Sequence, residues 1–444
     1  MSRALITDLY ELNMAASYLH RGFDDVATFS LFIRELPPER GYVVAAGLED
    51  CLDYLESFAF ADEDADWMIG TGFPPDLVQA LRALRFTGDV HAVPEGTVVF
   101  ANEPLLEVTA RLPEAQIVET YLLNRVSFQS ALATKAVRCR VAAPGIELVD
   151  FALRRTQGVD AAIALARVTA IAGFAGTSNV EAARLLGLRA VGTMAHSYVQ
   201  AFPGEEDAFR AFVEDLPPPY TFLVDTYDTA AGVRTAARVI AELGLSGRLA
   251  IRLDSGDLAS LAFEARRVLD EAGLHHVRIF ASGGLDEYRL EQLHAAGAPI
   301  DAAGVGTRLG VSADAPYLDS VYKLVQLGGG PRLKLSPGKV TLPGAKQVWR
   351  SLPEPDVLSL REEEPSPSRR LPLLEPVMRA GRRLRPRRSI TEARAALERD
   401  LHALPAEALR IRAPVAPEPV VSAGLRSLAA ATAAAAHGAG PPES

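Results

Sequence analysis

The chain has few of the residues that stabilise small disulfide-rich or zinc-binding folds. Its 444 residues include two cysteines, Cys51 and Cys139, which form no CxxC pair and no cluster with histidine. A disulfide framework and a zinc site are therefore not expected. The sequence also lacks a run of about 20 apolar residues, so we predict no membrane-spanning helix.

An excess of positive charge is missing as well. The 46 lysines and arginines are outnumbered by 56 aspartates and glutamates, and the net charge of -10 argues against nucleic acid or an anionic membrane as partner. A basic run from Arg382 to Arg388 lies near Glu362–Glu364 and has no aromatic platform, so we interpret it as the polar surface of a hairpin. Asp8 and Glu11 stand where a secretion signal would be basic and then apolar, which predicts a cytoplasmic protein.

Apolar residues make up 48% of the chain, enough for a sizeable core, and the length predicts two or three domains. Residues 1–142 are expected to form an N-terminal α+β domain. It would contain a helix over residues 5–20 and a small antiparallel sheet built from the short β-like runs in residues 86–112. Residues 318–350 return to β-like texture and are expected to complete this domain.

Residues 351–444 are expected to form a C-terminal extension. The Pro/Ser/Glu/Arg-rich segment 354–370 is typical of a linker, and the residues after it predict a hairpin that turns at Gly381. Ser389 is the predicted cap of a helix that ends near Leu404. The alanine-rich and Gly/Pro-rich tail has low complexity, and its last residues are expected to be disordered.

Between residues 143 and 317, short apolar runs alternate with alanine-rich amphipathic segments. This alternation predicts a parallel sheet with right-handed crossovers, and the strand ends recur at close to the ~30 residues per unit of a (β/α)₈ barrel. We count about seven units, which predicts an irregular (β/α) barrel. A doubly wound sheet is the alternative, although no GxGxxG motif follows a first strand. The predicted strands are residues 147–151, 173–175, 190–192, 221–224, 250–253, 278–281 and 302–305.

One histidine has a distinctive position. His196 is the only one of eight histidines that directly follows a strand-like run, and it lies in a turn of small residues. A histidine at such a point can act as a base, a metal ligand or a covalent nucleophile. A core histidine hydrogen-bonded to the backbone is the alternative when this segment is taken alone.

Polar residues and glycines follow the other predicted strands, at the edge where a parallel barrel gathers its functional loops. Glycine turns let the main chain approach a phosphate, acidic residues can bind ribose hydroxyls or Mg²⁺, and arginines can grip a carboxylate or pyrophosphate. Together with His196 they favour phosphoryl or phosphoribosyl chemistry. Plainer interpretations are tight turns for the glycines, helix caps for Asp254 and Asp257, and a solvated pair for Arg154 and Arg155. The loop residues are Arg154, Arg155, Thr156, Thr177, Ser178, Thr193, Ser197, Asp225, Thr226, Asp228, Arg252, Asp254, Ser255, Gly256, Asp257, Ser282, Gly283, Gly284, Gly304, Gly306 and Thr307.

At these residues the chain closely resembles the nicotinate phosphoribosyltransferase family. The resemblance covers roughly residues 5–350, followed by a family-like C-terminal extension, and several long motifs in the family's order make it specific. It implies an irregular α/β barrel of the type II phosphoribosyltransferase kind. The matching segments are TDLYEL (7–12), FALRR (151–155), GTMAHS (192–197), LVDTY (223–227), RLDSGDL (252–258), GVGT (304–307), YKL (322–324) and TLPG (341–344).

The resemblance implies an enzyme of NAD biosynthesis. It would make nicotinate mononucleotide and pyrophosphate from nicotinate and phosphoribosyl pyrophosphate, coupled to ATP hydrolysis through a phosphohistidine at His196. Mg²⁺ would be needed, without zinc, a metal site fixed by the protein or an organic prosthetic group. Tyr10 would stack on the pyridine ring across the interface of a homodimer with shared active sites.

The resemblance also implies roles for other residues. Thr193 and Arg252 match nicotinate contacts, and Thr307 matches a contact to the phosphoribosyl group. Asp254 and Asp225 are candidate catalytic carboxylates beside His196. Further candidate substrate contacts are Arg155, Ser255, Gly283, Gly284, Gly304 and Gly306.

Other functions stay open at this point. A related enzyme that uses quinolinate would need more cations in the base pocket, because quinolinate carries a second carboxylate. An enzyme that uses neutral nicotinamide would not need Arg252 as a charge partner. A catalytically silent barrel that binds or regulates is disfavoured by His196, Asp254 and the glycine turns. An aldolase-like barrel is disfavoured because no lysine occupies a strand end before Lys323.

Overall fold

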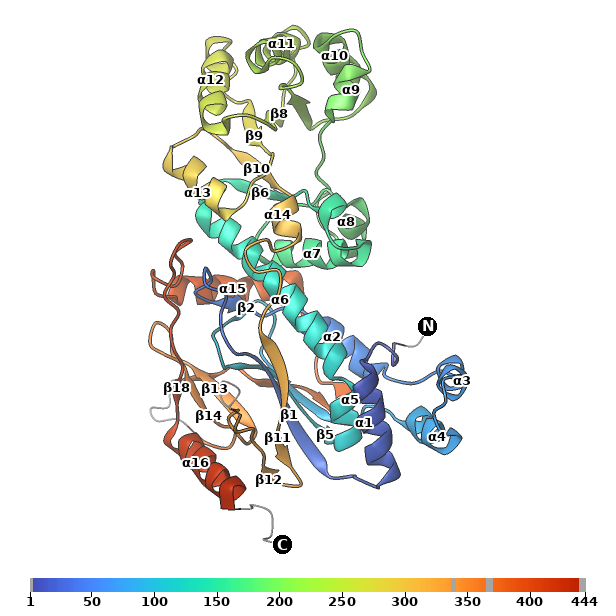
Figure 1. Ribbon diagram of the computed structural model, residues 1–444. Helices are drawn as coiled ribbons and strands as arrows, with labels where there is room; N and C mark the ends of the chain where they lie inside the picture. Colours follow the sequence, from blue (N-terminus) through green and yellow to red (C-terminus); the bar gives the residue numbers. More distant parts are fainter. Residues whose placement is uncertain (1–2, 337–340, 365–369, 439–444) are drawn as a thin grey trace. The chain divides into compact units, whose positions relative to one another are not determined.

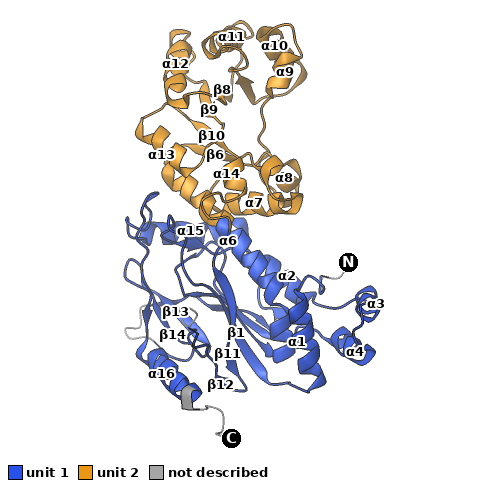
Figure 2. Cartoon of the chain, in the orientation of Figure 1, with its two compact units in different colours: residues 1–131, 317–444 blue, residues 132–316 orange. Residues whose placement is uncertain are grey.

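The computed structural model describes residues 3–336, 341–364 and 370–438, and the chain forms two compact units (Figures 1 and 2). Unit 1 comprises Met1–Ala131 and Tyr317–Ser444, and unit 2 comprises Leu132–Pro316. The C-terminal extension, expected as a separate part, therefore belongs to unit 1. No helix in the described part of the chain is long and apolar enough to cross a membrane.

Unit 2 starts earlier in the sequence than the predicted residue 143, inside helix α6 (Glu119–Ala142). Two cations of that helix explain this. Lys135 and Arg138 are buried and form ion pairs with Glu287 of unit 2, and Lys135 also contacts Asp314 at 2.9 Å. The end of α6 is thereby fixed to the second unit.

The main sheet of unit 1 has seven antiparallel strands in the order β12-β11-β1-β5-β3-β16-β17. It contains the segments expected from residues 86–112 and 318–350, and all residues of β1 after the first are buried. The strands are β1 (Val26–Ile33), β3 (Asp89–Ala92), β5 (Pro104–Arg111), β11 (Ser320–Leu327), β12 (Gly330–Pro331), β16 (Glu375–Arg379) and β17 (Arg382–Arg383), with β2 (Val43–Val44) and β4 (Val98–Val99) as a separate pair. The helices are α1 (Leu9–His20), α2 (Leu48–Glu56), α3 (Asp62–Gly70), α4 (Pro75–Ala83), α5 (Leu112–Ile117), α15 (Ile390–Ala403) and α16 (Ala423–Gly438).

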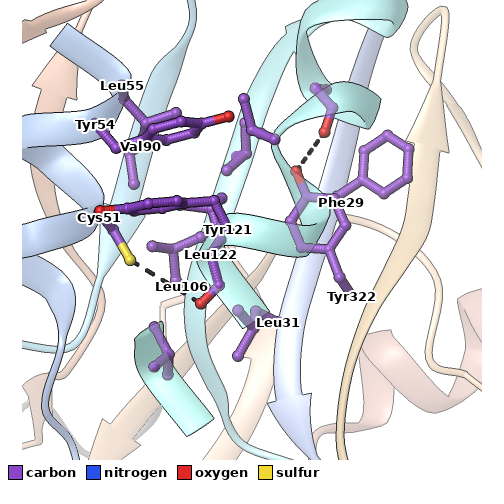
Figure 3. Packing of buried hydrophobic residues seen from close by; sticks show 14 of the residues in the cluster. Phe29, Leu31, Cys51, Tyr54, Leu55, Val90, Leu106, Tyr121, Leu122 and Tyr322 are labelled. Atoms are coloured by element: carbon purple, nitrogen blue, oxygen red, sulfur yellow. Dashed lines mark hydrogen bonds between the residues drawn. The ribbon is translucent and has the colours of Figure 1, made fainter. Parts of the chain in front are cut away.

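Aromatic pairs pack the core of unit 1 (Figure 3). The rings of Tyr54 and Tyr121 stack with centroids 3.9 Å apart, and those of Phe29 and Tyr322 stack at 4.8 Å. The buried Tyr322 hydroxyl donates to the carbonyl of Ala115 at 2.7 Å. Its polar end is therefore satisfied, as burial of a phenol requires.

A second, four-stranded sheet of unit 1 corrects the predicted linker over residues 354–370. Val357–Leu360 forms β14 within the order β15-β13-β14-β18, whose other strands are β13 (Lys346–Arg350), β15 (Leu371–Pro372) and β18 (Val420–Val421). The segment is ordered because Asp356, fully buried, accepts a 2.8 Å hydrogen bond from Arg350. Composition did not reveal this buried ion pair. Residues 365–369 of the segment lie outside the described residues.

The other predictions for the extension are confirmed where the structure describes it. Strands β16 and β17 form the hairpin, with Gly381 at φ +72° in its turn. The Ser389 hydroxyl accepts from the amide of Glu392 at 3.2 Å and caps α15. The alanine run lies in α16, and the tail predicted to be disordered lies, from residue 439, outside the described residues.

Two arginines of the basic run form ion pairs with acidic residues of α2. Arg383 pairs with Glu49 and Asp53, and Arg387 pairs with Asp50 at 2.9 Å. These pairs agree with the interpretation as a polar hairpin surface.

Unit 2 contains a parallel sheet in the order β6-β10-β9-β8-β7. Isolated parallel bridges add Thr177 next to Asp150, and Ala190 next to Thr177. Six of the seven predicted strands therefore follow one another as in a barrel, and Thr177, two residues after the predicted strand 173–175, takes the place of the seventh. No pairing joins Ala190 to β7 in this unit, all of whose residues are described. The strands are β6 (Glu147–Asp150), β7 (Tyr220–Leu223), β8 (Leu249–Leu253), β9 (Arg278–Ala281) and β10 (Ala302–Val305).

The predicted irregular barrel is thus confirmed, but two of its strands are reduced to single bridges. Gly173, at φ +97°, leaves the extended conformation at the start of the predicted strand 173–175. The helices of the unit are α6, α7 (Val159–Ile171), α8 (Val180–Leu186), α9 (His196–Gln200), α10 (Glu205–Asp215), α11 (Thr229–Glu242), α12 (Leu258–Glu271), α13 (Glu287–Ala295) and α14 (Thr307–Gly310), with a 3₁₀ turn over Leu153–Arg155.

Candidate active site

A cavity of about 380 Å³ lies at the carboxyl ends of the parallel strands of unit 2. This volume is within the range of small-molecule sites, and this edge of a barrel is where such sites form. The wall unites the ends of β6, β7 and β8 with the segment that carries His196. The lining residues are Phe151, Leu153, Arg154, Ser178, Gly192, Thr193, Met194, Ala195, His196, Leu223, Arg252 and Asp254.

Arg252, in β8, is the arginine of this wall whose guanidinium donates hydrogen bonds to several neighbouring residues. Its Nε donates to Ser282 Oγ and its Nη1 donates to Thr193 Oγ1, both at 2.7 Å. Its Nη2 donates to Asp254 Oδ1 at 2.6 Å, and the Met194 carbonyl lies 3.4 Å from Nη1. A guanidinium has five N–H donors, so about one is left for a ligand. A ligand carboxylate would gain a second bond only by displacing a present partner.

Asp254 connects Arg252 to His196. Its Oδ1 also accepts from Ser282 Oγ at 2.6 Å, and its Oδ2 lies 3.8 Å from His196 Nε2. Burial by itself would raise the pKa of Asp254, but the hydrogen bond from Ser282 and the charge of Arg252 outweigh it and lower the pKa below its ordinary value. Asp254 is therefore an anion at neutral pH.

His196 is the first residue of α9, and its side chain is 40% exposed. Its Nδ1 lies 3.2 Å from Thr226 Oγ1, in the loop after β7. Side-chain oxygens of two different loops thus hold the ring at the cavity. The alternative of a buried, backbone-bonded core histidine is wrong.

Asp225 supports the loop that carries Asp254. Its Oδ2 accepts from the Asp254 amide at 2.9 Å and from Ser255 Oγ at 2.7 Å. Its Oδ1 is buried and has no hydrogen-bond partner among the described residues. A carboxylate oxygen left without a donor suits a hard cation such as Mg²⁺, which takes oxygen ligands.

The alternative of helix caps for the two aspartates in this loop holds for one of them only. Asp257 Oδ1 accepts from the Ala259 amide at 3.3 Å and caps α12. Asp254 instead turns to Arg252 and the cavity.

The glycine turns differ in what requires the glycine. Gly283 has φ +94°, and a Cβ there would lie 1.9 Å from the Asp254 carbonyl oxygen, so the turn after β9 packs directly on the Asp254 loop. A Cβ on Gly304 would lie 2.5 Å from the Phe151 ring, so this glycine makes room for the ring. Gly284, at φ +64°, has open space, and Gly306 precedes α14.

Three other predicted residues lie outside the cavity wall. Thr307 is exposed at the start of α14, and Tyr10 belongs to unit 1. Arg155 is exposed, whereas its neighbour Arg154 is part of the wall. The sequence could not separate these two arginines, because the 3₁₀ turn that orients them follows no clear pattern.

The structure gives contacts to two residues at predicted strand ends: Ser282, which the sequence placed among the loop residues without a role, and Phe151, which it did not select as a site residue. The Arg252 guanidinium lies 5.6 Å from the centroid of the Phe151 ring, at the end of β6. Ser282 contacts both Arg252 and Asp254. Phe151 ends the predicted strand 147–151, and that position is the signal by which it could have been found.

Within the described ranges, no group of three or more His, Cys, Asp or Glu residues could hold a metal ion. Cys51 and Cys139 are buried and free, and burial raises the pKa of both thiols. Asp225 and Asp254 are the two carboxylates near the cavity that could meet a cation bound to a substrate.

Two family models match the chain. The nicotinate phosphoribosyltransferase (NAPRTase) N-terminal domain matches residues 5–127, and the NAPRTase family matches residues 146–325. A nicotinate phosphoribosyltransferase of Mycobacterium tuberculosis is 48% identical over 411 residues, which cover 91% of this chain and 88% of the relative. The human nicotinate phosphoribosyltransferase is 34% identical, over 96% of each chain.

Solved structures agree with these relatives. The structure of human nicotinic acid phosphoribosyltransferase is similar with a TM-score of 0.84 and 30% identity, over 96% of this chain and 99% of that one. A nicotinate-nucleotide pyrophosphorylase from Pyrococcus furiosus is similar with a TM-score of 0.75 and 26% identity, over 90% and 95%.

Proposed function

The chain belongs to the nicotinate phosphoribosyltransferase family, and we propose that it couples its reaction to ATP hydrolysis through phosphorylation of His196. The protein is a nicotinate phosphoribosyltransferase of NAD biosynthesis, with nicotinate and phosphoribosyl pyrophosphate as substrates. The observation that carries the proposal is the chain of contacts Arg252–Asp254–His196. It places a half-exposed imidazole against an ionised carboxylate at the edge of the cavity.

In the transfer step, the ring nitrogen of nicotinate attacks the anomeric carbon as pyrophosphate leaves, and the sugar passes through an oxocarbenium-like state. This step needs little covalent help from the protein, so positioning and charge dominate. We assign the nicotinate carboxylate to the free N–H of Arg252 and to Thr193. Asp225 would hold Mg²⁺ through its unpartnered Oδ1, and the ion would supply charge that neutralises the leaving pyrophosphate.

In the coupling step, a nitrogen of His196 accepts the γ-phosphoryl group of ATP, and ADP leaves. Asp254 can stabilise the positive ring during this transfer, because its Oδ2 lies 3.8 Å from Nε2 and its pKa is lowered. The new phosphate adds close to two negative charges beside the cavity. Such a charge can reorganise the loop and the groups that bind the substrates.

Labelling with γ-³²P ATP tests this proposal. We expect acid-labile label on His196 and none on the His196→Ala variant, while this variant keeps some ATP-independent transfer. Thr226→Val is the matched variant, because it removes the Nδ1 contact and leaves the imidazole in place. Label on another residue, or undiminished label on His196→Ala, would refute the phosphohistidine.

We also propose a homodimer in which Tyr10 enters the site of the partner subunit. Ile6, Leu9 and Tyr10, at the start of α1, are 50%, 61% and 52% exposed, which is unusual for neighbouring apolar side chains unless a partner covers them. A mixture of Tyr10→Ala and His196→Ala chains should regain ATP-coupled activity, since one site of each mixed dimer has both residues. Verified subunit exchange without recovery would contradict the shared site.

The relatives, rather than the charges of the cavity wall, favour nicotinate over quinolinate. The wall contains two arginines, Arg154 and Arg252, and Asp254 already balances one of them. With Arg252 assigned to the nicotinate carboxylate, Arg154 is the one arginine of the wall left for the second carboxylate of quinolinate. We also propose that the protein is located in the cytoplasm. Cell fractionation tests this location.

A further inference from the structure

A second cavity, of about 230 Å³, lies at the opposite, amino-terminal ends of the strands of unit 2. Its inner wall is apolar. Val149, Phe280 and Ala302 form a small buried cluster there, with Val191 packed against it. A planar apolar ring is the kind of group that such walls favour.

Three arginines surround one glutamate in the lining of this cavity. Glu147 lies 3.1 Å from Arg189, 2.8 Å from Arg278 and 3.7 Å from Arg248. It is the single carboxylate of the lining, which therefore carries an excess of positive charge. The nearby Asp301 directs its Oδ2 to the amide of Ile279 at 2.8 Å.

The side chains of the three arginines differ in how many hydrogen bonds they donate. Arg189 donates a hydrogen bond to Glu147, and Arg278 donates to Glu147 and to the Asp301 carbonyl. The Arg248 side chain has the ion pair at 3.7 Å and no hydrogen bond to the described residues. Its donors are thus available at the mouth of an apolar cavity.

The two cavities share part of their walls. Gly192 and Thr193 line both, and Thr193 accepts the 2.7 Å hydrogen bond from Arg252. Phe280, in the second cavity, stacks on Phe151 of the first with ring centroids 5.5 Å apart. A ligand in the second cavity would therefore touch Thr193, which contacts Arg252 directly, and Phe280, which stacks on the Phe151 ring that lies by the Arg252 guanidinium.

From these contacts we propose that the second cavity binds a small aromatic carboxylate as a site separate from the active site. The aromatic ring lies against Phe280 and Val149, and the carboxylate pairs with Arg248 and one neighbouring arginine. Nicotinate has this chemistry, so the substrate itself is the probe. Because Thr193 belongs to both walls, a ligand in the second site changes the position of Thr193 and thereby the hydrogen bond that Arg252 donates to it.

Equilibrium binding of radiolabelled nicotinate without phosphoribosyl pyrophosphate tests the proposal, because no transfer takes place. The Arg252→Leu chain, whose active site has lost the arginine contact to the carboxylate, should still bind one nicotinate at the second site. Adding Arg248→Gln should weaken this binding about tenfold or more, as expected for the loss of a charge-assisted hydrogen bond. Nicotinamide, which lacks the carboxylate, should not compete.

Arg234→Gln is the matched control, because Arg234 is exposed on α11 and lines neither cavity. It removes the same charge and should leave binding unchanged. The proposal is overturned if folded Arg252→Leu binds no nicotinate, or if its nicotinate is insensitive to Arg248→Gln. Transferase activity of the single Arg248→Gln variant is measured in parallel, so failure of this site is distinguished from failure of the active site.

Discussion

Arg252 is predicted to select nicotinate over nicotinamide. The structure leaves it about one free N–H, so the substrate carboxylate gains one charge-assisted bond there. A second bond forms only when the Thr193 hydroxyl turns to it from the Met194 carbonyl, to which it donates at 3.1 Å. Bonds of this kind contribute roughly 1.5–3 kcal/mol, which corresponds to about ten- to more than a hundredfold in binding. Arg252→Leu should therefore raise the KM for nicotinate by about that factor and reduce the preference over nicotinamide in parallel.

The assay is steady-state kinetics with both bases at saturating phosphoribosyl pyrophosphate and Mg²⁺. Arg252→Lys is the matched variant, because it keeps the charge but loses the planar fork that holds Ser282 and Asp254 together. It should show an intermediate KM. Leucine also leaves Asp254 without its cation, so a thermal melt must first show that the variant is folded. An unchanged base preference in folded Arg252→Leu would refute the reasoning, and Arg154 would be the next candidate.

Two further predictions concern other parts of the chain. Gly283→Ala should abolish most transferase activity, because its Cβ would lie 1.9 Å from the Asp254 carbonyl oxygen, whereas Gly284→Ala, with open space, should be milder; equal activities would contradict this. Burial and the charge of Glu11 raise the pKa of Glu119 to about 8 in the folded state. Ionisation of Glu119 therefore destabilises the fold as the pH rises from the pKa of this group in the unfolded chain towards 8. Glu119→Gln should therefore raise Tm at pH 8 more than at pH 5, and a pH-independent change in Tm would argue against it.

The sequence predicted the barrel from features that act locally. Alternating apolar and amphipathic runs specify strands and helices, and residues two apart on a strand face the same side, which brings Arg252 to Asp254. Long-range pairing is not visible in this way. Asp356 orders β14 through Arg350, and composition alone shows only a polar, proline-rich segment.

The same limit applies to the site. His196 could be selected because it follows a strand-like run, but its partner Thr226 is 30 residues away and reaches it only through the fold. The choice between Arg154 and Arg155 depends on one 3₁₀ turn. Glu147 and its three arginines come from four separate segments, so their meeting at one end of the barrel required the strand order.

Asp254 links the two halves of the proposed reaction physically. Its Oδ1 accepts a hydrogen bond from Arg252, and its Oδ2 faces His196. The charge of His196 therefore affects the strength of the hydrogen bond between Asp254 and Arg252. A phosphate on His196 would place negative charge beside an existing carboxylate, and like charges at such separations repel appreciably in a partly buried site. Asp254 lies between His196 and Arg252 in this chain of contacts, and any shift of Asp254 changes how many N–H groups of Arg252 are free for the nicotinate carboxylate. In the proposed mechanism, ATP use and base recognition would therefore meet at one aspartate.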